Sequence, residues 1–243
     1  MNIIIPCYII NEELLQLTKN TVESLSGHDL ILIDNASPLG GGYLRSVAYT
    51  YIRNTENLGY AKAVNQGLKL VSDNLVAISN NDVRPSPNWE EVARSVFREN
   101  GNTYSCHFRM INYEEPYQYG SQTVYEGKER WCTSSFFVIS AACAKMEYEP
   151  LLFDEQYGIG GYEDWQYWTE VREACLYTAY TDRACYQHHH SSTQNSLDQE
   201  ERKERDKTSR EYFKSKWGEY PEDRFSRLYP EQMSQEYRDG FQI

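Results

Sequence analysis

The chain has 243 residues, of which 40% are hydrophobic and 25% are charged, and its formal net charge at pH 7 is -12. This length fits one globular domain, or one domain with a tail, and is long enough to bury a sizeable core. The acidic balance argues against a surface that neutralises phosphate backbones. We therefore do not expect duplex nucleic acid as a partner.

The six cysteines are scattered, form no C-x-x-C pair and follow no secretory leader. No stretch approaches the roughly 20 apolar residues that a membrane-spanning helix needs. The sequence thus predicts a cytoplasmic protein without a transmembrane segment, in which reduced thiols serve mostly as small core residues.

In the first half of the chain, short apolar runs alternate with amphipathic segments. The runs are too continuous for strands buried on one face, which favours a mainly parallel sheet flanked by helices in an α/β fold. Asn11 is a candidate N-cap, and the glycines at 40–42 predict a turn. We expect strands over 2–7, 29–33, 49–53 and 75–79, and helices over about 12–25 and 60–71.

The second half has fewer clear elements. A helix is expected over 87–99, and strands over 103–113 and 132–139 with a tyrosine-rich hairpin or loop between them. Further on, the pattern predicts a helix from Glu163 to about 175 and a short strand over 185–187. From about 195 the chain is heavily charged, helical by propensity and solvated on most faces.

Polar residues follow three of the predicted strands in the first half, at Pro6–Tyr8, Asp34–Asn35 and Asn80–Asp82. Any one cluster is explained by turn chemistry, since Asn and Asp favour turns. Ligands of parallel α/β sheets, however, bind beyond the carboxyl ends of the strands. Three clusters at equivalent places therefore indicate a binding site on one edge of the sheet.

The order of these signals resembles the family 2 inverting glycosyltransferases of the GT-A fold. The resemblance covers about residues 2–194 and rests on the motifs IIIPCY, LIDNAS, NTENLGYAKAVNQGL, ISNNDVRPSPNW, FDEQYGIGGYEDWQYW and a histidine run followed by Ser and Thr. It implies a Rossmann-like GT-A domain over 1–194. Its nucleotide-binding half is about 1–100, its smaller acceptor half is about 101–194, and a helical extension follows over 195–243.

On the donor side, the resemblance implies that Pro6 and Tyr8 line the nucleotide pocket and that Asp34 contacts the base. A carboxylate there accepts hydrogen bonds from an imide N–H or from ribose hydroxyls. The alternative for Asp34 is an Asx turn into the residues that follow it.

The segment from Asn57 through Gly59 to Asn65 matches the family's helix-opening signature. Gly59 permits a close backbone approach where amide N–H groups point out of a helix start, which suits a polar or anionic ligand. Asn65 is a poor choice inside a helix, so it hydrogen-bonds either the ligand or a neighbouring loop as an internal buttress.

Asn80, Asn81 and Asp82 occupy the position of the family's D-x-D motif, and Asn80 replaces its first carboxylate. By this resemblance Asp82 binds Mn²⁺ or Mg²⁺ together with the donor's phosphates. A histidine after the strand at 185–187 is the expected second ligand. In an extended segment only alternate side chains share a direction, so His188 and His190 are the candidates, His188 first. A solvated loop is the alternative.

Glu163 and Asp164 correspond to the family's acidic pair at the acceptor helix. Inverting transfer needs a base for the acceptor hydroxyl, and a carboxylate among aromatic neighbours such as Trp165 can have its pKa raised toward that task. Asp164 is the predicted base, Glu163 an orienting neighbour and Trp165 a substrate contact. Two acids at a helix start can also be dipole-favoured caps.

Together these features predict a metal-dependent inverting hexosyltransferase. It would take a sugar from a UDP or dTDP type donor to a hydroxyl of a glycan or glycoconjugate, and an oligomer is possible. Two alternatives remain open. One is a non-catalytic sugar-nucleotide-binding module, and the other a nucleotidyltransferase on a related sheet, although Cys7–Glu13 lacks the basic glycine-rich loop of that class.

Overall fold

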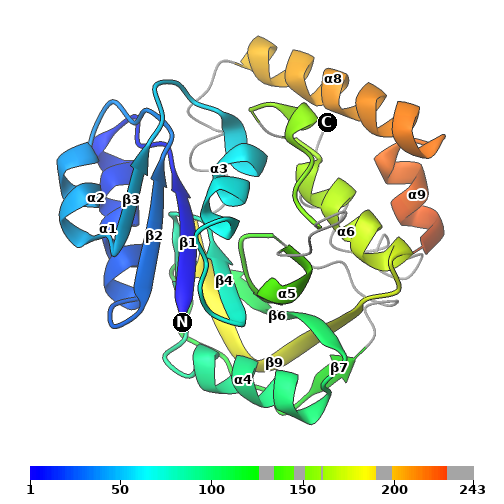
Figure 1. Ribbon diagram of the computed structural model, residues 1–243, viewed down its shortest axis with the longest axis horizontal. Helices are drawn as coiled ribbons and strands as arrows, with labels where there is room; N and C mark the ends of the chain where they lie inside the picture. The colour runs from blue at the N-terminus through cyan, green and yellow to red at the C-terminus, as the bar shows by residue number, and fades with distance from the viewer. Residues whose placement is uncertain (126–133, 145–150, 160, 190–198, 229–243) are drawn as a thin grey trace.

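The computed structural model describes residues 1–125, 134–144, 151–159, 161–189 and 199–228. One nine-stranded sheet crosses the molecule in the order β3-β2-β1-β4-β8-β6-β9-β5, and β7 pairs with β9 (Figure 1). The strands are β1 (Asn2–Cys7), β2 (Asp29–Asp34), β3 (Thr50–Arg53), β4 (Leu75–Ser79), β5 (Val83–Pro85), β6 (Thr103–Asn112), β7 (Thr123–Tyr125), β8 (Phe136–Ser140) and β9 (Tyr177–His188).

Helices cover both faces of this sheet. Figure 1 shows α1 and α2 on one side of strands β1 to β3 and α3 on the other. The helices are α1 (Glu12–Ser24), α2 (Gly41–Val47), α3 (Gly59–Leu68), α4 (Trp89–Glu99), α5 (Ala141–Ala144), α6 (Glu163–Glu173), α8 (Gln199–Trp217) and α9 (Pro221–Leu228), with a 3-10 turn at Glu155–Tyr157.

The sheet is parallel in the first half of the chain and mixed in the second. Strand β1 runs parallel to both β2 and β4, and β2 runs parallel to β3. Strand β8 is antiparallel to β4 and β6, whereas β6 and β9 are parallel. The predicted α/β fold with helices on both faces is confirmed.

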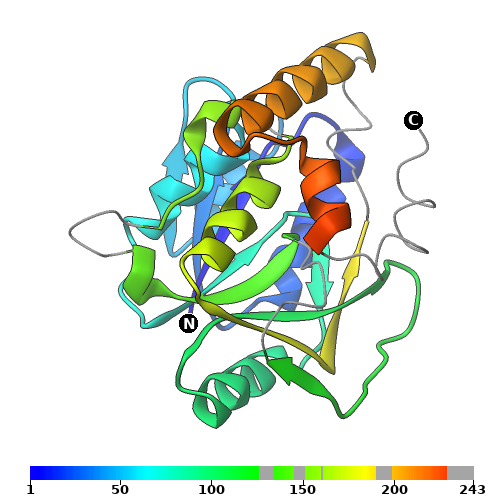
Figure 2. The same ribbon diagram turned by 90° about the vertical axis from the view of Figure 1, so that its right-hand side faces the viewer.

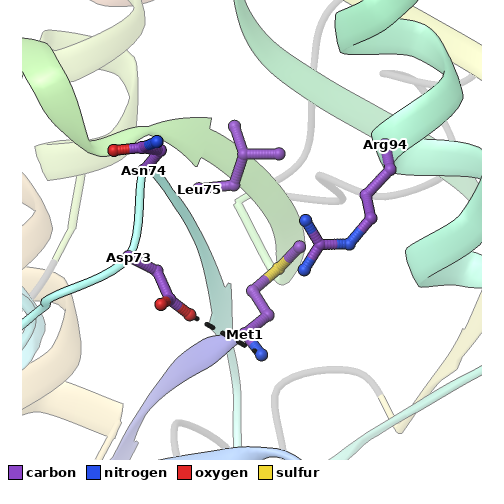
Figure 3. Close-up of a pocket in the computed structure, with 5 residues that line it drawn as sticks. All are labelled: Met1, Asp73, Asn74, Leu75 and Arg94. Atoms are coloured by element: carbon purple, nitrogen blue, oxygen red, sulfur yellow. Dashed lines mark ion pairs between the residues drawn. The ribbon is translucent and has the colours of Figure 1, made fainter.

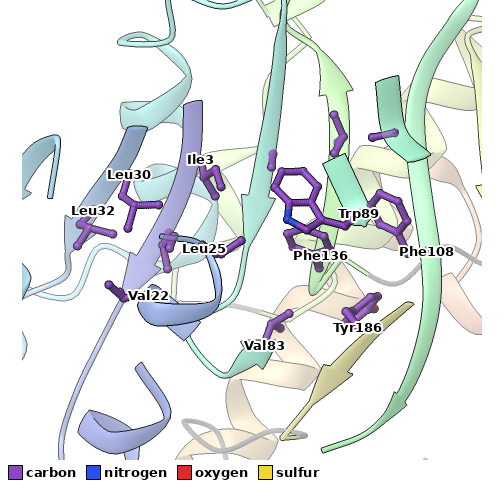
Figure 4. Close-up of a cluster of buried hydrophobic side chains, with 14 of the residues drawn as sticks. Ile3, Val22, Leu25, Leu30, Leu32, Val83, Trp89, Phe108, Phe136 and Tyr186 are labelled. Atoms are coloured by element: carbon purple, nitrogen blue, oxygen red, sulfur yellow. The ribbon is translucent and has the colours of Figure 1, made fainter. Parts of the chain in front are cut away.

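Side chains point to opposite faces of the sheet in turn along each strand, so a hydrophobic core forms on each face. Ile3 and Ile5 of β1 pack with α1, α2 and α4, while Ile4 packs on the opposite face with α3 and α6. Figure 4 shows part of the first core, where Trp89 meets Phe136 edge to face. Burial on both faces explains why these runs contain no regularly alternating polar residues.

One local prediction in the first half was wrong. The glycines at 40–42 do not form a turn alone, because Gly40 takes a left-handed conformation (φ 76°) and α2 begins at Gly41. Strand β5 was also not predicted from the sequence. Val83–Pro85 pairs antiparallel with β9 at the edge of the sheet, where proline is tolerated.

The second half departs further from the predicted pattern. Strand β9 has 12 residues rather than the three expected, and β7 pairs with it instead of forming a hairpin with a neighbour in sequence. The described part of β8 begins at Phe136, and the expected strand residues 132–133 lie outside the described ranges.

The C-terminal helices are part of the folded body. Figures 1 and 2 show α8 and α9 along the outer side of α6. Phe213 of α8 and Phe225 of α9 are 1% and 6% exposed and pack with Trp165. The expectation of a helix solvated on most faces holds for the first turns of α8 but not for this apolar contact. Within the described ranges, no helix is long and apolar enough to cross a membrane.

Candidate active site

The carboxyl ends of β2, β1 and β4 lie side by side, as the parallel pairing requires. The chain leaving β2 is tied to β1, because Asn35 N donates to the Cys7 carbonyl at 2.8 Å. Pro6 and Tyr8, the predicted nucleotide contacts, are half-buried at this end of β1. The predicted polar clusters therefore meet at one edge of the sheet.

Asp34 is fully buried and committed to protein partners. Its Oδ1 accepts from Ser37 N at 2.8 Å, which is the Asx turn considered as an alternative. Its Oδ2 accepts from the Tyr51 hydroxyl at 2.7 Å and from Arg53 Nη1. The carboxylate thus neutralises Arg53 and joins the ends of β2 and β3.

The start of α3 is held against the chain segment that leads to α6. Gly59 has φ 83°, and a Cβ there would lie 1.8 Å from the carbonyl oxygen of Gly158. Asn57 Oδ1 accepts from Gly59 N at 3.0 Å. The close approach that the sequence predicted at Gly59 is therefore made, in the structure, to protein backbone.

Asn65 is the internal buttress that the sequence left as an alternative to a ligand contact. Its side chain accepts from Phe153 N at 3.0 Å and donates to the Phe153 carbonyl at 2.8 Å. It also donates to Glu155 Oε1 at 3.0 Å. These bonds fix the start of the segment that carries the acidic pair.

Asp82 and His188 form the donor-side pair. His188 Nε2 lies 3.3 Å from Asp82 Oδ1, and the two residues are 8% and 5% exposed. The pairing of β5 with β9 explains this, because Val83 stands opposite His188. His189 donates its backbone N–H to the Asp82 carbonyl and turns its ring toward Tyr113. His190 lies outside the described residues.

This pair fits part of a divalent cation site. It offers one hard oxygen and one imidazole nitrogen, and no cluster of three or more candidate ligands occurs among the residues the structure describes. Mg²⁺ and Mn²⁺ take about six ligands and commonly draw several from water and substrate phosphate. Asp82 and His188 therefore suit a cation that arrives with a phosphate ligand.

The two asparagines before Asp82 point to different places. Asn80 is half-buried, and its backbone N–H donates to the Ser135 carbonyl at 2.7 Å. Asn81 is 7% exposed and donates from Nδ2 to Thr18 Oγ1 at 2.9 Å, so it fastens this end of β4 to α1. Asn80 is thereby tied to Ser135, whose hydroxyl oxygen lies 3.3 Å from His188 Nδ1.

Glu163 and Asp164 begin α6 as a half-buried acidic pair. Burial and the neighbouring Asp164 charge raise the pKa of Glu163 to about 7. Burial raises the pKa of Asp164 to about 6. Among the described residues, no donor reaches Glu163 Oε2. Trp165 N donates to Asp164 Oδ1 at 2.9 Å, so the pair also interacts with the backbone at the helix start, as the capping alternative expects.

Trp165 faces away from the sheet edge. It is 8% exposed, and its ring lies 5.1 Å from Phe225 and 5.5 Å from Tyr162, centroid to centroid. Trp217 Nε1 donates to Gln166 Oε1 at 2.6 Å on the same side of α6. The contacts of Trp165 and Trp217 thus anchor α6 to the C-terminal helices.

Sequence reasoning missed two residues that connect α6 with the donor-side pair. Ser134 Oγ accepts from Trp168 Nε1 of α6 at 2.8 Å. Ser135 Oγ lies 3.3 Å from His188 Nδ1. The signal was present in CTSSFF, where two hydroxyls precede a strand that pairs antiparallel with β4 and so begins at the edge where β4 ends.

A surface hollow lies at the opposite edge of the sheet. It is lined by Met1, Asp73, Asn74, Leu75 and Arg94, and the Met1 amino group pairs with Asp73 across it (Figure 3). Met1, Asp73, Asn74 and Leu75 lie at the amino ends of β1 and β4, and Arg94 comes from α4. The hollow is therefore remote from the strand ends that carry the candidate site.

Comparison with known proteins identifies the family of the chain. The family model described as Glycosyl transferase family 2 matches residues 2–153. The chain belongs to glycosyl transferase family 2. No curated protein matches it.

Solved structures of similar fold are glycosyltransferases of the GT-A class. TarS 1–349 from S. aureus is 14% identical with a TM-score of 0.58, and the match covers 76% of this chain and 58% of that one. The mannosyltransferase PcManGT from Pyrobaculum calidifontis is 13% identical with a TM-score of 0.57, covering 76% and 55%. The chain thus spans less than two thirds of these relatives' lengths, and the likeness confirms the predicted GT-A fold.

Proposed function

We propose that this protein is a metal-dependent inverting glycosyltransferase that moves a hexosyl group from a nucleoside-diphosphate donor to a hydroxyl of a glycan or glycoconjugate. One observation carries the proposal. The helix that begins with Glu163 and Asp164 reaches Ser134 through Trp168 Nε1, and the adjacent Ser135 contacts His188 of the Asp82–His188 pair. A site for a charged diphosphate and a site for a base would thereby lie near each other.

The donor is a sugar nucleotide, and we propose the UDP or dTDP type. Among the structural relatives, TarS was solved with UDP-GlcNAc and with UDP, and PcManGT with GDP-Man and Mn²⁺. In this chain Pro6, Tyr8 and the segment at Asn57–Gly59 line the edge where the nucleotide would lie. Asp34 would act on the base through the Arg53 side chain that it holds, or directly if Arg53 moves.

A divalent cation would be held by Asp82 and His188 and would neutralise charge on the diphosphate as it leaves. Asp82 supplies the hard oxygen that Mn²⁺ and Mg²⁺ share, and the imidazole favours Mn²⁺. Ser135 fixes the other nitrogen of the His188 ring, which orients Nε2 toward Asp82.

In this proposal Asp164 is the base of the transfer step. The acceptor oxygen attacks the anomeric carbon from the face opposite the diphosphate, so a new C–O bond forms while the bond to the phosphate oxygen breaks. The electron pair of that bond leaves with the nucleoside diphosphate. The hydroxyl proton goes to the Asp164 carboxylate, whose pKa of about 6 leaves it ionised at neutral pH yet basic enough to accept.

The two alternatives are less well supported. A nucleotidyltransferase disagrees with membership of glycosyl transferase family 2 and with the absence of a basic glycine-rich loop in the Cys7–Glu13 sequence. A silent binding module would have no need for an acidic pair with raised pKa values at the start of α6. The link from α6 through Trp168, Ser134 and Ser135 to His188 favours catalysis.

A donor screen tests the proposal. The protein is incubated with UDP-, dTDP- and GDP-sugars, with Mn²⁺, Mg²⁺ or EDTA, and release of nucleoside diphosphate is measured along with the thermal shift. We expect one class of sugar nucleotide to lose its sugar, by transfer or by hydrolysis, only when a divalent cation is present. Thermal stabilisation without any turnover, across a broad acceptor panel, would favour the non-catalytic module.

A further inference from the structure

We propose that Arg53, rather than Asp34, determines which nucleotide base this protein accepts. The guanidinium of Arg53 would select a base that carries a carbonyl oxygen over one that carries an amino group at the same position. This inference deepens the proposed function and rests on it, because it concerns the base of the nucleoside-diphosphate donor.

The carboxylate of Asp34 is out of reach of a ligand. Asp34 is 0% exposed, and both of its oxygens accept hydrogen bonds from the protein. Oδ1 accepts from Ser37 N, and Oδ2 accepts from the Tyr51 hydroxyl and from Arg53 Nη1. A base N–H could bond to this carboxylate only by displacing one of these donors. The exposed member of the cluster is Arg53, whose side chain is 42% exposed.

The guanidinium of Arg53 is fixed in direction as well as exposed. Its Nη1 donates to Asp34, and its Nη2 donates to the Ser37 carbonyl at 3.1 Å. These bonds use two of the five N–H donors of a guanidinium, so others remain for a ligand. Because the group is planar and rigid, two bonds set the directions of the remaining donors as well.

Arg53 also stands in the row of strand ends along which the nucleotide would extend. The parallel register places Cys7 of β1 opposite Asp34 of β2, and Asp34 opposite Arg53 of β3. On the other side of β1 lies β4, which leads to Asp82. Neighbouring strands are about 4.8 Å apart, so a donor with its phosphates at Asp82 would direct its base across β1 toward the ends of β2 and β3.

A guanidinium in this place distinguishes bases by the group at the edge of the ring. Uracil and thymine carry an accepting carbonyl oxygen at position 4, whereas cytosine carries a donating amino group there. Since a guanidinium has donors only, it bonds to the carbonyl and meets the amino group donor to donor. The same chemistry favours guanine, which has a carbonyl at position 6, over adenine, which has an amino group.

Calorimetry with the full chain and Mn²⁺ tests this inference by comparing UDP with CDP, and GDP with ADP. We expect UDP to bind about tenfold or more tightly than CDP. In Arg53→Gln the UDP:CDP ratio should fall toward one, because an amide offers both a donor and an acceptor. Arg45→Gln is the control for charge alone. Arg45 lies over the Tyr51 ring, so its loss should weaken UDP and CDP equally.

Two neighbouring glycines of α2 give a matched pair of variants that leave Arg53 and Asp34 in the chain. A Cβ on Gly41 would lie 2.9 Å from Arg53 Nη1, whereas a Cβ on Gly42 would have no atom within 4 Å. The atom that must move in Gly41→Ala is the end of a flexible side chain, so the fold should tolerate the change. We expect Gly41→Ala to lower the UDP:CDP ratio and Gly42→Ala to keep it.

Three results would overturn the inference. They are equal binding within both nucleotide pairs in the unaltered protein, an equal loss of UDP and CDP affinity in Arg53→Gln, and a higher UDP:CDP ratio in Arg53→Gln. The second would make Arg53 only the counter-ion of Asp34, and the third would give the base contact to Asp34. Failure of the proposed function is distinguishable, because a protein that keeps the base preference but transfers sugar from no donor would retain the Arg53 role and lose the enzymatic one.

Discussion

Asp82 Oδ1 and His188 Nε2 lie 3.3 Å apart, although one residue follows the fourth strand of the sheet and the other ends the last. The short edge strand β5 brings them together by pairing antiparallel with β9, with Val83 opposite His188. Both side chains are nearly buried. A carboxylate and an imidazole placed this way at the end of a parallel sheet suit a cation that carries a diphosphate.

Nucleotide binding should therefore depend on a divalent cation. Asp82 and His188 supply too few ligands alone, so the nucleotide's phosphates and the cation should bind together. We expect calorimetry to show tight UDP or dTDP binding with Mn²⁺ and at least tenfold weaker binding in EDTA, an order of magnitude being about 1.4 kcal/mol. Asp82→Ala should lose most of the cation-dependent part. Equal affinity with and without EDTA would remove the cation from the mechanism.

The two adjacent histidines provide a matched pair of variants. His188→Gln removes the ring nitrogen beside Asp82, so it should weaken Mn²⁺-dependent nucleotide binding about tenfold or more. His189→Gln should have little effect, because the ring of His189 lies against Tyr113 and its contact with Asp82 is through the backbone. The measurement is a Mn²⁺ titration at fixed nucleotide. A larger loss in His189→Gln would reassign the ligand.

The parallel half of the fold could be predicted from the sequence because β1, β2 and β4 are apolar on both faces and amphipathic segments lie between them. Asn11 indeed caps α1, accepting from Leu14 N at 2.8 Å. The second half could not be predicted as well, because its order depends on pairing between distant segments. Strand β9 contacts β5, β6 and β7, and none of those partners is adjacent to it in sequence.

For the candidate site, the sequence singles out residues but not their contacts. Asp82, Asp164 and His188 stand out by residue type and by their place after a strand or at a helix start. Ser134 does not, because a serine before a strand is common and its partner Trp168 approaches from another element. Asp34 is the opposite case. Its place at a strand end predicts a contact with the nucleotide base, but in the structure the carboxylate accepts a hydrogen bond from Arg53.

Asp164 should separate catalysis from donor binding. Asp164→Asn keeps the volume but cannot accept the acceptor's proton, so transfer should fall about 100-fold or more while donor affinity and folding barely change. Glu163→Gln should cost much less. Steady-state kinetics with calorimetry of donor binding measures both. A collapsed rate in Glu163→Gln with near-normal transfer in Asp164→Asn would move the base by one residue, and normal rates in both would exclude a carboxylate base.

Because the pKa of Glu163 is raised, the free energy of unfolding should depend on pH, and replacing Glu163 should stabilise the protein at high pH. A carboxyl whose folded pKa is raised to about 7 from 4.5 favours folding only while it is protonated. That contribution is complete below about pH 4.5 and is lost as the pH rises through about 7. Glu163→Gln imitates the protonated form at every pH, so it should be more stable than the unaltered protein at pH 8, by about 1–3 kcal/mol, and equal to it near pH 4.5.

Chemical denaturation of both proteins at several pH values checks this difference. Glu200→Gln is a suitable control, because Glu200 is an acid on α8 with its side chain 84% exposed. It should give no difference that changes with pH. If Glu163→Gln were no more stable than the unaltered protein at pH 8, the ionised Glu163 carboxylate would not destabilise the folded state.

The C-terminal helices should be needed for a stable catalytic helix. Phe213 is 1% exposed and packs in one cluster with Trp165 and Phe225, so Phe213→Ala should lower the free energy of unfolding by about 3 kcal/mol. Because Trp165 directly follows Asp164, transfer should fall as well, whereas cation-dependent nucleotide binding should persist.

Lys203→Ala is the control for this last change, since the Lys203 side chain on the same helix is 71% exposed and should affect neither stability nor transfer. Denaturant unfolding, nucleotide calorimetry and transfer rates are measured on both variants. A chain ending at Gln194 should behave as the more severe case and aggregate, because it uncovers Trp165. If that shortened chain stayed folded and transferred sugar normally, the C-terminal helices would be an appendage, and α6 would be positioned by Asn65 and the Gly59–Gly158 contact alone.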